Sequence, residues 1–242
     1  MQLTDCTIVV TGAARGIGRS IVEELRAAGA FVGALDLLPM PEEEGVLPVV
    51  CDVRDAAAVD AAIAQIAAWR GRIDGVVNNA GILRDGALVK LGKGGIQALD
   101  LESWNDTVQT NLTGTFHVAR AAVPVMITSK AKGAVVNVSS ISRQGNAGQG
   151  AYAASKAAVS AVTRTWAEEL AFFKIRVVAI APGLIDTPMM QAIPKDRLDR
   201  YRPRIPAGKV GEPSAIAKMV RSVFENDYVN GTTIEVDGGF RF

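Results

Sequence analysis

The sequence predicts one α/β domain, spanning residues 1–242, with a doubly wound parallel sheet of about seven strands and helices on both faces of the sheet. Seven short apolar runs occur along the chain without polar alternation, which is typical of strands covered on both faces. Segments of helical length separate these runs, and this β-α-β order predicts parallel strands. The chain has 242 residues, 49% of them hydrophobic, which suits one domain with a large core.

The first expected strand, residues 7–10, is a run of β-branched residues, and the others lie at 31–35, 46–51, 75–77, 134–138, 176–181 and 232–236. Helices are expected at 16–28, 56–69, 101–127, 152–173 and 213–225, and Pro213 suits the first turn of the last one. Residues 83–100 and 185–211 are expected to be loops because they are rich in glycine and proline, respectively. Both follow strand ends, where open α/β sheets bind ligands, so we expect them to border a site.

The charges of the chain are balanced, with 26 basic and 25 acidic side chains. No basic stretch favours nucleic acid, and no charged tail favours a membrane surface. The apolar runs are too short to span a membrane and the N-terminus lacks the regions of a signal peptide, so we expect a cytoplasmic protein. Cys6 and Cys51 are expected to be reduced buried thiols, and they are too few for a metal site.

A glycine-rich segment with the sequence TGAARGIG follows the first strand at residues 11–18 and opens the first helix. Glycine lets the backbone turn sharply and approach a pyrophosphate, and the helix N-terminus supplies free N–H groups. The same spacing could also serve only as a tight strand–helix connection. We expect five residues of this turn to contact a dinucleotide: Gly12, Arg15, Gly16, Ile17 and Gly18.

Asp36 favours the dinucleotide interpretation. It ends the second strand, 18 residues after Gly18, where a carboxylate accepts hydrogen bonds from ribose hydroxyls. The same charge repels a 2′-phosphate, so we expect NAD(H) to be preferred. Arg15 could reach such a phosphate, which leaves NADP(H) open.

The ends of the third and fourth strands also carry candidate cofactor contacts. Asp52 and Val53 could contact the adenine. Asn79, Ala80 and Gly81, within Asn-Asn-Ala-Gly at residues 78–81, could hold a strand end open against the cofactor ribose. Taken alone, this second segment could equally be a polar turn.

Tyr152 and Lys156 are four residues apart in an expected helix, so they share a face. A nearby ammonium favours the phenolate form of a tyrosine, and acid–base work near neutrality needs a pKa lowered by roughly three units from ~10. Such a phenol can exchange a proton with an oxygen at carbon. Alone, the pair could be a surface Tyr and Lys on an amphipathic helix.

Taken together, these motifs resemble those of the short-chain dehydrogenase/reductase family, in order and spacing, with Pro182-Gly183 as a further match. The resemblance covers essentially the whole chain and implies a Rossmann-type fold, a nicotinamide cofactor, and oxidation of an alcohol or reduction of a carbonyl. The chain looks most similar to 3-oxoacyl-acyl-carrier-protein reductases and related carbonyl reductases. The family also implies a homotetramer that packs helices 101–127 and 152–173 against copies of themselves.

The resemblance implies a four-residue catalytic set. Tyr152 matches the general acid/base, Lys156 the lysine that holds the nicotinamide ribose and lowers the tyrosine pKa, and Asn111 the asparagine of a proton relay. The usual spacing selects Ser139 as the catalytic serine, whereas the strand pattern selects Ser140. We favour Ser140, because strand register fixes side-chain direction more firmly than loop length does.

The segment from Pro182 to Thr187 resembles the family's loop over the nicotinamide. The resemblance implies that Pro182 and Gly183 bind the cofactor and that Ile185 and Thr187 contact the carboxamide. The leading functional hypothesis is an NAD(H)-dependent oxidoreductase of a small alcohol or ketone. The alternative is an NADPH-dependent 3-oxoacyl-acyl-carrier-protein reductase of fatty-acid synthesis, acting on an acyl thioester. A nucleotide-sensing protein without catalysis and a methyltransferase are rivals from other classes, but neither explains the Tyr–Lys pair.

Overall fold

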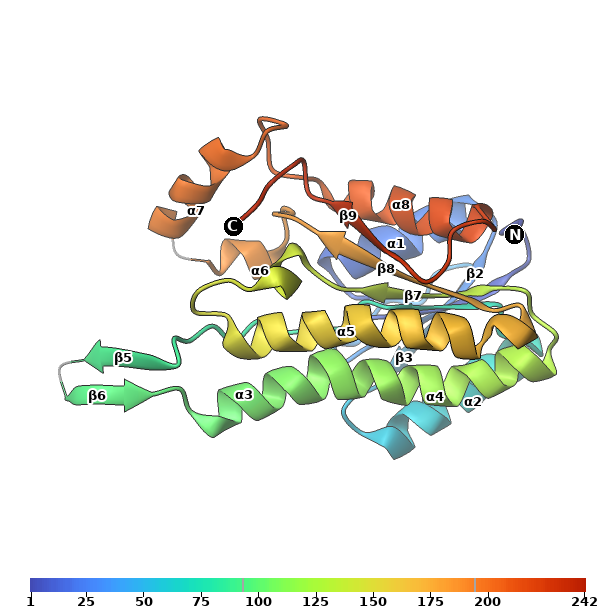
Figure 1. Cartoon of the computed structure of the whole chain (residues 1–242). Helices are drawn as coiled ribbons and strands as arrows, with labels where there is room; N and C mark the ends of the chain where they lie inside the picture. The colour runs from blue at the N-terminus through green and yellow to red at the C-terminus, as the bar shows by residue number, and fades with distance from the viewer. Residues whose placement is uncertain (93, 194) are drawn as a thin grey trace.

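The computed structural model describes residues 1–92, 94–193 and 195–242. Seven parallel strands form its main sheet, in the order β3-β2-β1-β4-β7-β8-β9 (Figure 1). The strands are β1 (Thr7–Thr11), β2 (Phe31–Asp36), β3 (Val46–Val50), β4 (Gly75–Asn78), β7 (Ala134–Val138), β8 (Arg176–Pro182) and β9 (Thr233–Val236). The predicted doubly wound α/β fold is therefore confirmed, and every expected strand lies within a residue or so of its predicted position.

Helices cover both faces of this sheet. The helix pair on one face is α1 (Gly16–Ala27) and α8 (Pro213–Glu225), and the layer on the other comprises α2 (Ala56–Arg70), α4 (Gly114–Thr128) and α5 (Gly150–Glu169). Successive strand residues serve opposite layers, since Ile8 and Val10 pack with α1 and α8 whereas Val9 packs with α2 and α4. This double burial explains why the strands are apolar throughout.

The expected helix at 101–127 is interrupted. It consists of α3 (Leu101–Val108), one π-helical turn, η1 (Gln109–Thr113), and α4. A π-turn inserts one residue into the helical register, and such turns are frequent at functional sites. The expected helix at 152–173 starts at Gly150 and ends in a 3₁₀ turn, η3 (Ala171–Phe173).

The two expected loops carry structure of their own. Within residues 83–100, β5 (Val89–Gly92) and β6 (Gly95–Ala98) form an antiparallel pair that projects from the body (Figure 1). Within 185–211, the short helices are α6 (Pro188–Gln191), α7 (Lys195–Tyr201) and the 3₁₀ turn η4 (Arg202–Arg204). The prediction that these two segments are loops was wrong, because their glycines and prolines lie at the ends of short helices and strands and do not prevent them from forming.

The strand order reverses direction between β1 and β4, which is where open α/β sheets bind ligands. The carboxyl ends of these strands carry Thr11 and Asn78. In the part of the chain that the structure describes, no helix has the length and apolar character needed to cross a bilayer.

Candidate active site

The glycine-rich turn between β1 and α1 has a backbone that only glycine adopts easily. Gly12 and Gly16 have φ angles of +63° and +58°. A Cβ on Gly18 would lie 1.9 Å from the Gly12 carbonyl oxygen, and one on Gly12 would lie 2.9 Å from the Ala80 Cα. The turn is therefore closed tightly against the end of β4, and side chains at these positions would block it.

Asn79 ties this turn to β4. Its Nδ2 donates to the carbonyl oxygens of Thr11, at 2.9 Å, and Gly12, at 3.1 Å. The Thr11 hydroxyl accepts hydrogen bonds from the backbone N–H groups of Asn79 and Ala80, both at 3.0 Å. The Asn79 side chain thus fixes the shape of the turn, which leaves the backbone and Gly81 as the parts of this segment that can face a ligand.

Asp36 lies beside the same turn, at the end of β2. One carboxylate oxygen accepts from the Ala14 N–H at 2.9 Å, and the other accepts from the Leu38 N–H at 3.0 Å. Each oxygen retains further acceptor capacity. Arg15 is exposed at the N-cap of α1. A carboxylate held at the strand end next to a glycine cradle fits the ribose of a dinucleotide.

Asp52 and Val53 follow β3 rather than end it, because the strand stops at Val50. Both Asp52 oxygens are engaged by Arg54, with the shortest contact 2.7 Å from Nη2, and this bonding lowers the pKa of the Asp52 carboxyl. Val53 is buried, and its carbonyl oxygen lies 3.0 Å from Nδ1 of His117. An adenine contact by Asp52 would therefore compete with Arg54.

Tyr152 and Lys156 lie one turn apart on α5, and the Lys156 Nζ is 5.8 Å from the centroid of the tyrosine ring. Lys156 is only 4% exposed, and its ammonium donates to the Val138 carbonyl oxygen at 2.7 Å. Burial lowers the pKa of Lys156 to about 8. The structure thus brings together a phenol and a buried ammonium beside the carboxyl end of β7.

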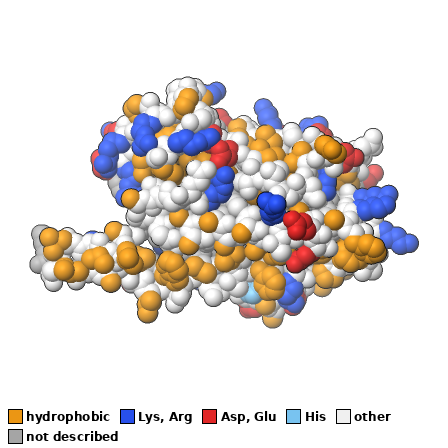
Figure 2. Space-filling view, viewed as in Figure 1, with side chains coloured by type: hydrophobic (Ala, Val, Ile, Leu, Met, Phe, Trp, Pro, Cys, Tyr) orange, Lys and Arg blue, Asp and Glu red, His pale blue; other side chains and the backbone are white. Residues whose placement is uncertain are grey.

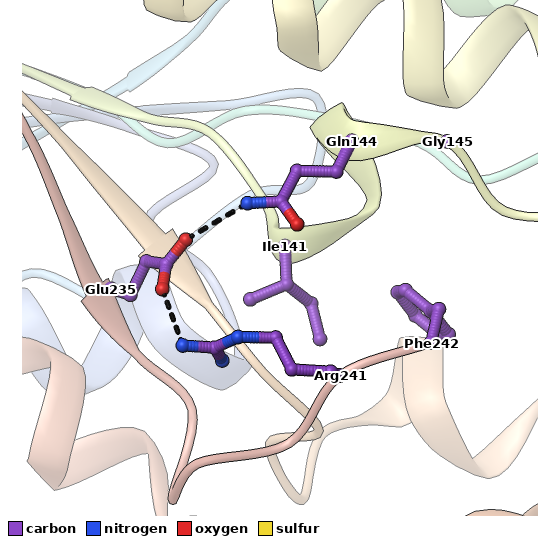
Figure 3. A pocket seen from close by; sticks show the side chains of 6 residues that line it. All are labelled: Ile141, Gln144, Gly145, Glu235, Arg241 and Phe242. Carbon is purple, nitrogen blue, oxygen red and sulfur yellow. Dashed lines mark hydrogen bonds and ion pairs between the residues drawn. The ribbon is translucent and has the colours of Figure 1, made fainter.

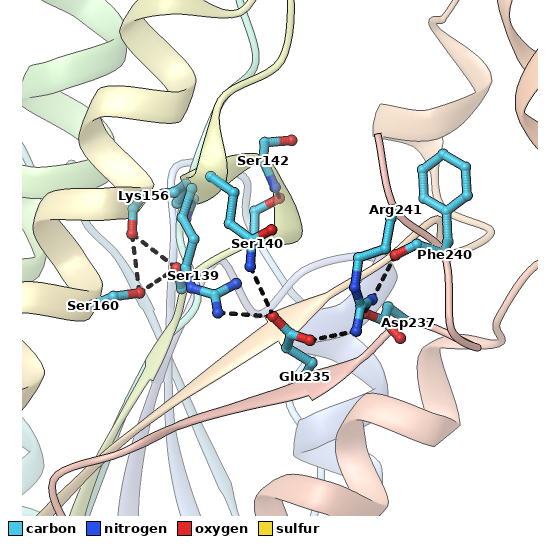
Figure 4. A network of polar contacts seen from close by, with 11 residues as sticks. Ser139, Ser140, Ser142, Lys156, Ser160, Glu235, Asp237, Phe240 and Arg241 are labelled. Atoms are coloured by element: carbon cyan, nitrogen blue, oxygen red, sulfur yellow. Dashed lines mark hydrogen bonds and ion pairs between the residues drawn. The ribbon is translucent and has the colours of Figure 1, made fainter.

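The two candidate serines point in different directions. Ser139 donates to the carbonyl oxygen of Lys156 at 2.8 Å and contacts the Ser160 hydroxyl at 2.9 Å (Figure 4). Ser140 caps the turn η2 (Ile141–Gln144) by accepting from the Ser142 N–H at 3.0 Å, and its hydroxyl is also hydrogen-bonded to Tyr152. The side chain of Ser139 therefore braces α5, whereas that of Ser140 faces the phenol.

Three effects act on the pKa of Tyr152. Burial raises it most, the hydrogen bond with Ser140 lowers it, and the negative charge of Asp85 raises it. The net pKa of Tyr152 is raised, so burial outweighs the lowering that the Lys156 ammonium was expected to cause. Asp85 also pairs with Arg197 of α7 at 2.8 Å, which places a charged link from the 185–211 segment close to the tyrosine.

Asn111 is fully buried in the π-turn. Its side chain accepts from the Ile82 N–H at 2.8 Å, donates to the Ile82 carbonyl oxygen at 3.0 Å, and donates to the Ser155 hydroxyl at 3.2 Å. A Cβ on Gly81 would lie 3.1 Å from the Asn111 Oδ1 and 3.4 Å from the Lys156 Nζ. Asn111 and Lys156 therefore face a common point beside Gly81. This point is accessible because Gly81 has no side chain.

The segment after β8 starts at the same edge of the sheet. A Cβ on Gly183 would lie 2.6 Å from the Cα of Asp237, the residue after β9, so this close approach requires glycine. The Thr187 hydroxyl caps α6 by accepting from the Met190 N–H at 3.3 Å, and its methyl group lies beside Gly16. The Ile185 side chain is only 6% exposed and packs into the core, so only its backbone is available to a cofactor.

Glu235 joins the C-terminus to the turn that follows Ser140. It accepts from Arg143 at 2.8 Å, from Gln144 at 3.2 Å and from Arg241 at 2.7 Å (Figure 4). A hollow of about 140 Å³ lies beside these groups, lined by Ile141, Gln144, Gly145, Glu235, Arg241 and Phe242 (Figure 3). It is too small for a dinucleotide, and we interpret the network as a brace for the Ser140 turn.

Two residues of the site, Ser155 and Asp85, were not predicted from the sequence. Ser155 was overlooked although it lies between Tyr152 and Lys156, where its hydroxyl accepts from Asn111. Asp85 carries no local signature, because its partner Arg197 is 112 residues away along the chain. The remaining predicted residues converge on one edge of the sheet, and their glycine cradle and strand-end carboxylate fit a nicotinamide dinucleotide.

Comparisons with known proteins agree with this arrangement. Residues 12–241 match the family model described as enoyl-(acyl carrier protein) reductase. The 3-oxoacyl-acyl-carrier-protein reductase FabG of Thermotoga maritima is 39% identical, over 99% of both chains. The (3R)-3-hydroxyacyl-CoA dehydrogenase of Homo sapiens is 34% identical, over 98% of this chain and 96% of that one.

Among solved structures, a levodione reductase superposes with a TM-score of 0.86 at 30% identity, covering 98% of this chain and 97% of that one. The aldohexose dehydrogenase of Thermoplasma acidophilum has the same TM-score, 0.86, at 29% identity, and covers 98% of this chain and 94% of that one. Matches of this extent in sequence and structure leave one conclusion. The chain belongs to the short-chain dehydrogenase/reductase family of oxidoreductases.

Proposed function

We propose that this protein transfers a hydride between NAD(H) and an alcohol or ketone, with Tyr152 as the general acid/base. The observation that carries the proposal is the meeting of Tyr152 with Lys156 and Ser140 at the edge of the sheet that also bears the glycine cradle. The Lys156 ammonium lies 5.8 Å from the phenol ring, and the Ser140 hydroxyl is hydrogen-bonded to Tyr152.

A nicotinamide held in this site would donate a hydride in the reducing direction and accept one in the oxidising direction, and residues of the chain would handle the proton. In the reducing direction the Tyr152 hydroxyl donates its proton to the carbonyl oxygen of the substrate. The Ser140 hydroxyl donates a hydrogen bond to that same oxygen and stabilises the charge that develops on it. In the oxidising direction the phenolate form of Tyr152 accepts the proton instead.

Lys156 and Asn111 serve the return of the proton. An ammonium has three N–H groups, and Val138 engages one of them, so the others can bind the nicotinamide ribose. Its positive charge favours the phenolate and opposes the effect of burial on Tyr152. The point beside Gly81 that Lys156 and Asn111 both face suits a water that relays the proton to bulk solvent.

We propose a preference for NAD(H) over NADP(H) because of Asp36. Its carboxylate is held at the end of β2 by two backbone N–H groups, at 2.9 and 3.0 Å, next to the cradle. A ribose diol donates to such a carboxylate, whereas a 2′-phosphate is repelled by it. Arg15 is exposed and directly follows Ala14, which bonds to Asp36, and it is the residue through which NADP(H) could still be accepted.

We propose 3-oxoacyl and 3-hydroxyacyl thioesters as the first substrates to test, since relatives at 34% and 39% identity are named for them. The second candidate function is an NADPH-dependent 3-oxoacyl-acyl-carrier-protein reductase, and the name of the Thermotoga maritima relative favours its substrate. Initial rates with NADH and NADPH, each on carrier-bound thioesters, coenzyme A thioesters and free ketones, separate the two. We further propose a cytoplasmic homotetramer, as in the family that the sequence resembles.

The test of the mechanism is Tyr152→Phe. We expect turnover to fall by roughly 10²–10⁴-fold, because the acid/base group is removed, while the dissociation constant for NADH stays nearly unchanged. The matched control is Tyr228→Phe, which removes a hydroxyl from a side chain that is 97% exposed and should leave both quantities unaltered. Substantial turnover by Tyr152→Phe would refute the role of the phenol.

A further inference from the structure

A series of polar contacts joins α7 to the turn that carries Ser140. It starts at Asp85, in the segment after β4, where one carboxylate oxygen accepts from the Arg197 Nη1 of α7 at 2.8 Å and from the Gln149 Nε2 at 3.3 Å. Gln149 is the N-cap residue of α5 and is only 6% exposed. Asp85 thus holds α7 and the start of the tyrosine helix at one atom.

The amide of Gln149 continues this series to the serine turn. Its Oε1 accepts from the Ser142 hydroxyl and from the Asn146 Nδ2, both at 2.9 Å. The Ser142 N–H in turn donates to the Ser140 hydroxyl at 3.0 Å, and that hydroxyl is hydrogen-bonded to Tyr152. An arginine on α7 is therefore connected to the phenol through an unbroken series of polar contacts.

Arg197 differs from the other basic side chains of its helix. Figure 2 shows Lys and Arg side chains gathered over α7 and the turn that follows it. The Arg200 side chain is 71% exposed and pairs with Asp196 within the same helix, whereas that of Arg197 is 32% exposed. Among the residues that the structure describes, the pair of Arg197 with Asp85 is the one ion pair that joins residues 185–211 to the rest of the chain.

The Asp85 carboxylate also acts on Tyr152 through its charge, since it raises the pKa of the phenol. Arg197 lies against this carboxylate and opposes that effect, while the Lys156 Nζ of α5 lies 5.8 Å from the centroid of the phenol ring. The charged side chains on the other elements that pack against α5 have partners of their own: Arg143 with Glu235, Glu102 and Asp106 with Arg84, and Arg176 with the carbonyl oxygens of Val229 and Phe224. The balance of charge between Asp85 and Arg197 therefore bears directly on the phenol.

We propose that Asp85 and Arg197 are positioning residues of this active site. Their ion pair fastens α7 to the turn that carries Ser140 and offsets a negative charge close to Tyr152. Asp85 acts through Gln149 and through its own charge, and Arg197 acts through Asp85. The inference rests on the proposed role of Tyr152 as general acid/base, and it adds α7 to the elements that set the geometry of the phenol and the serine.

The test compares variants of the two partners of one ion pair. Asp85→Asn removes the negative charge, whereas Arg197→Gln leaves that charge without its cation, and both variants break the same contact. In the oxidation of a short-chain 3-hydroxyacyl-CoA by NAD⁺, the phenolate of Tyr152 is the active form, so kcat/KM rises with pH through the pKa of this group. We expect this rise to move to lower pH in Asp85→Asn and to higher pH in Arg197→Gln, by roughly half a pH unit or more.

Three further variants serve as controls. Arg197→Lys retains the positive charge, so we expect the profile to return toward that of wild type. Arg200→Gln and Asp196→Asn make the same charge changes on α7 at side chains that are 71% and 75% exposed, and they should leave the profile unaltered. Because a broken pair loosens the Ser140 turn, we also expect kcat at the optimal pH to fall several-fold in both Asp85→Asn and Arg197→Gln, with an unchanged dissociation constant for NADH.

A titration of tyrosinate absorbance without substrate, corrected with Tyr152→Phe, follows the same phenol independently of turnover. We expect its midpoint to move in the same two directions. Shifts of Asp85→Asn and Arg197→Gln in one direction, or shifts no larger than those of Arg200→Gln and Asp196→Asn, would overturn the proposal. Substantial turnover by Tyr152→Phe would instead refute the general acid/base role, and opposite shifts in absorbance would still support the action of the ion pair on the phenol.

Discussion

Replacing Lys156 with methionine should give a protein without bound nucleotide whose stability relative to wild type falls as the pH rises above about 8. Lys156 is 4% exposed, and burial lowers its pKa to about 8 from the ordinary 10.5. At about 1.4 kcal/mol per pH unit, the gap corresponds to roughly 3 kcal/mol of folding free energy spent on keeping this ammonium charged below pH 8. Methionine of similar length removes that cost.

The sign of the pH dependence follows from the lowered pKa. Below about pH 8 the lysine is protonated in both the folded and the unfolded chain, so wild type carries the full cost. Between about 8 and 10.5 the unfolded chain binds more protons than the folded one, and the stability of wild type therefore rises with pH. The variant has no such group, so wild type should recover up to ~3 kcal/mol relative to it over this range.

Loss of the bond to Val138 works in the opposite direction. The buried carbonyl oxygen of Val138 loses its donor at 2.7 Å, which costs about 1–3 kcal/mol at every pH. The difference at pH 7 alone is therefore small, and the change of the difference with pH is the diagnostic quantity.

The assay is urea unfolding of wild type and Lys156→Met at several values between pH 7 and 10, with Lys218→Met as the control. Lys218 lies on the exposed side of α8, and its removal should give a stability difference that does not vary with pH. A constant difference between wild type and Lys156→Met across this range would refute the argument that Lys156 is held charged at a cost in stability.

Three further outcomes follow from the site. Asp36→Ala should shift the ratio of NADH to NADPH affinity toward NADPH by about tenfold or more, because the ribose hydroxyls of NADH lose hydrogen bonds to a charged group. An unchanged ratio of the two dissociation constants would contradict the proposed cofactor preference. Ser140→Ala should lower turnover by roughly 10²-fold, whereas Ser139→Ala should mainly lower thermal stability. Steady-state kinetics and calorimetry measure the two effects, and a larger loss of turnover in Ser139→Ala than in Ser140→Ala would contradict the assignment. Gly18→Ala should abolish nucleotide binding or folding, since its Cβ would lie 1.9 Å from a carbonyl oxygen, whereas Gly150→Ala, with open space around it, should bind nucleotide normally in the same titration.

Much of the fold could be predicted because the strands are buried on both faces. A continuous β-branched run such as residues 7–10 suits a strand that is buried on both faces of an α/β sheet, and β1 forms there. The last helix, Pro213–Glu225, begins at its proline as expected. The convergence of Tyr152 and Lys156 was also predictable, because their spacing places them on one face of a helix whatever the tertiary structure.

Features that depend on distant partners were out of reach. In the π-turn, the Asn111 side chain bonds to the backbone of Ile82, 29 residues earlier. The effect of Asp85 on Tyr152 depends on how the segment after β4 lies over α5. The direction of the Tyr152 pKa shift was misjudged for the same reason, since the extent of burial is a property of the packed protein and not of the motif.

The hydrogen bonds of Asn79 and Thr11 have an evolutionary consequence. These hydrogen bonds hold the glycine-rich turn by contacts among β1, β4 and the turn itself, and none of them involves a residue of the 185–211 segment. Insertions or replacements around α6 and α7 can therefore accumulate without loosening that grip. Such modularity lets one scaffold diversify the molecules it acts upon while its shared coenzyme chemistry is inherited intact.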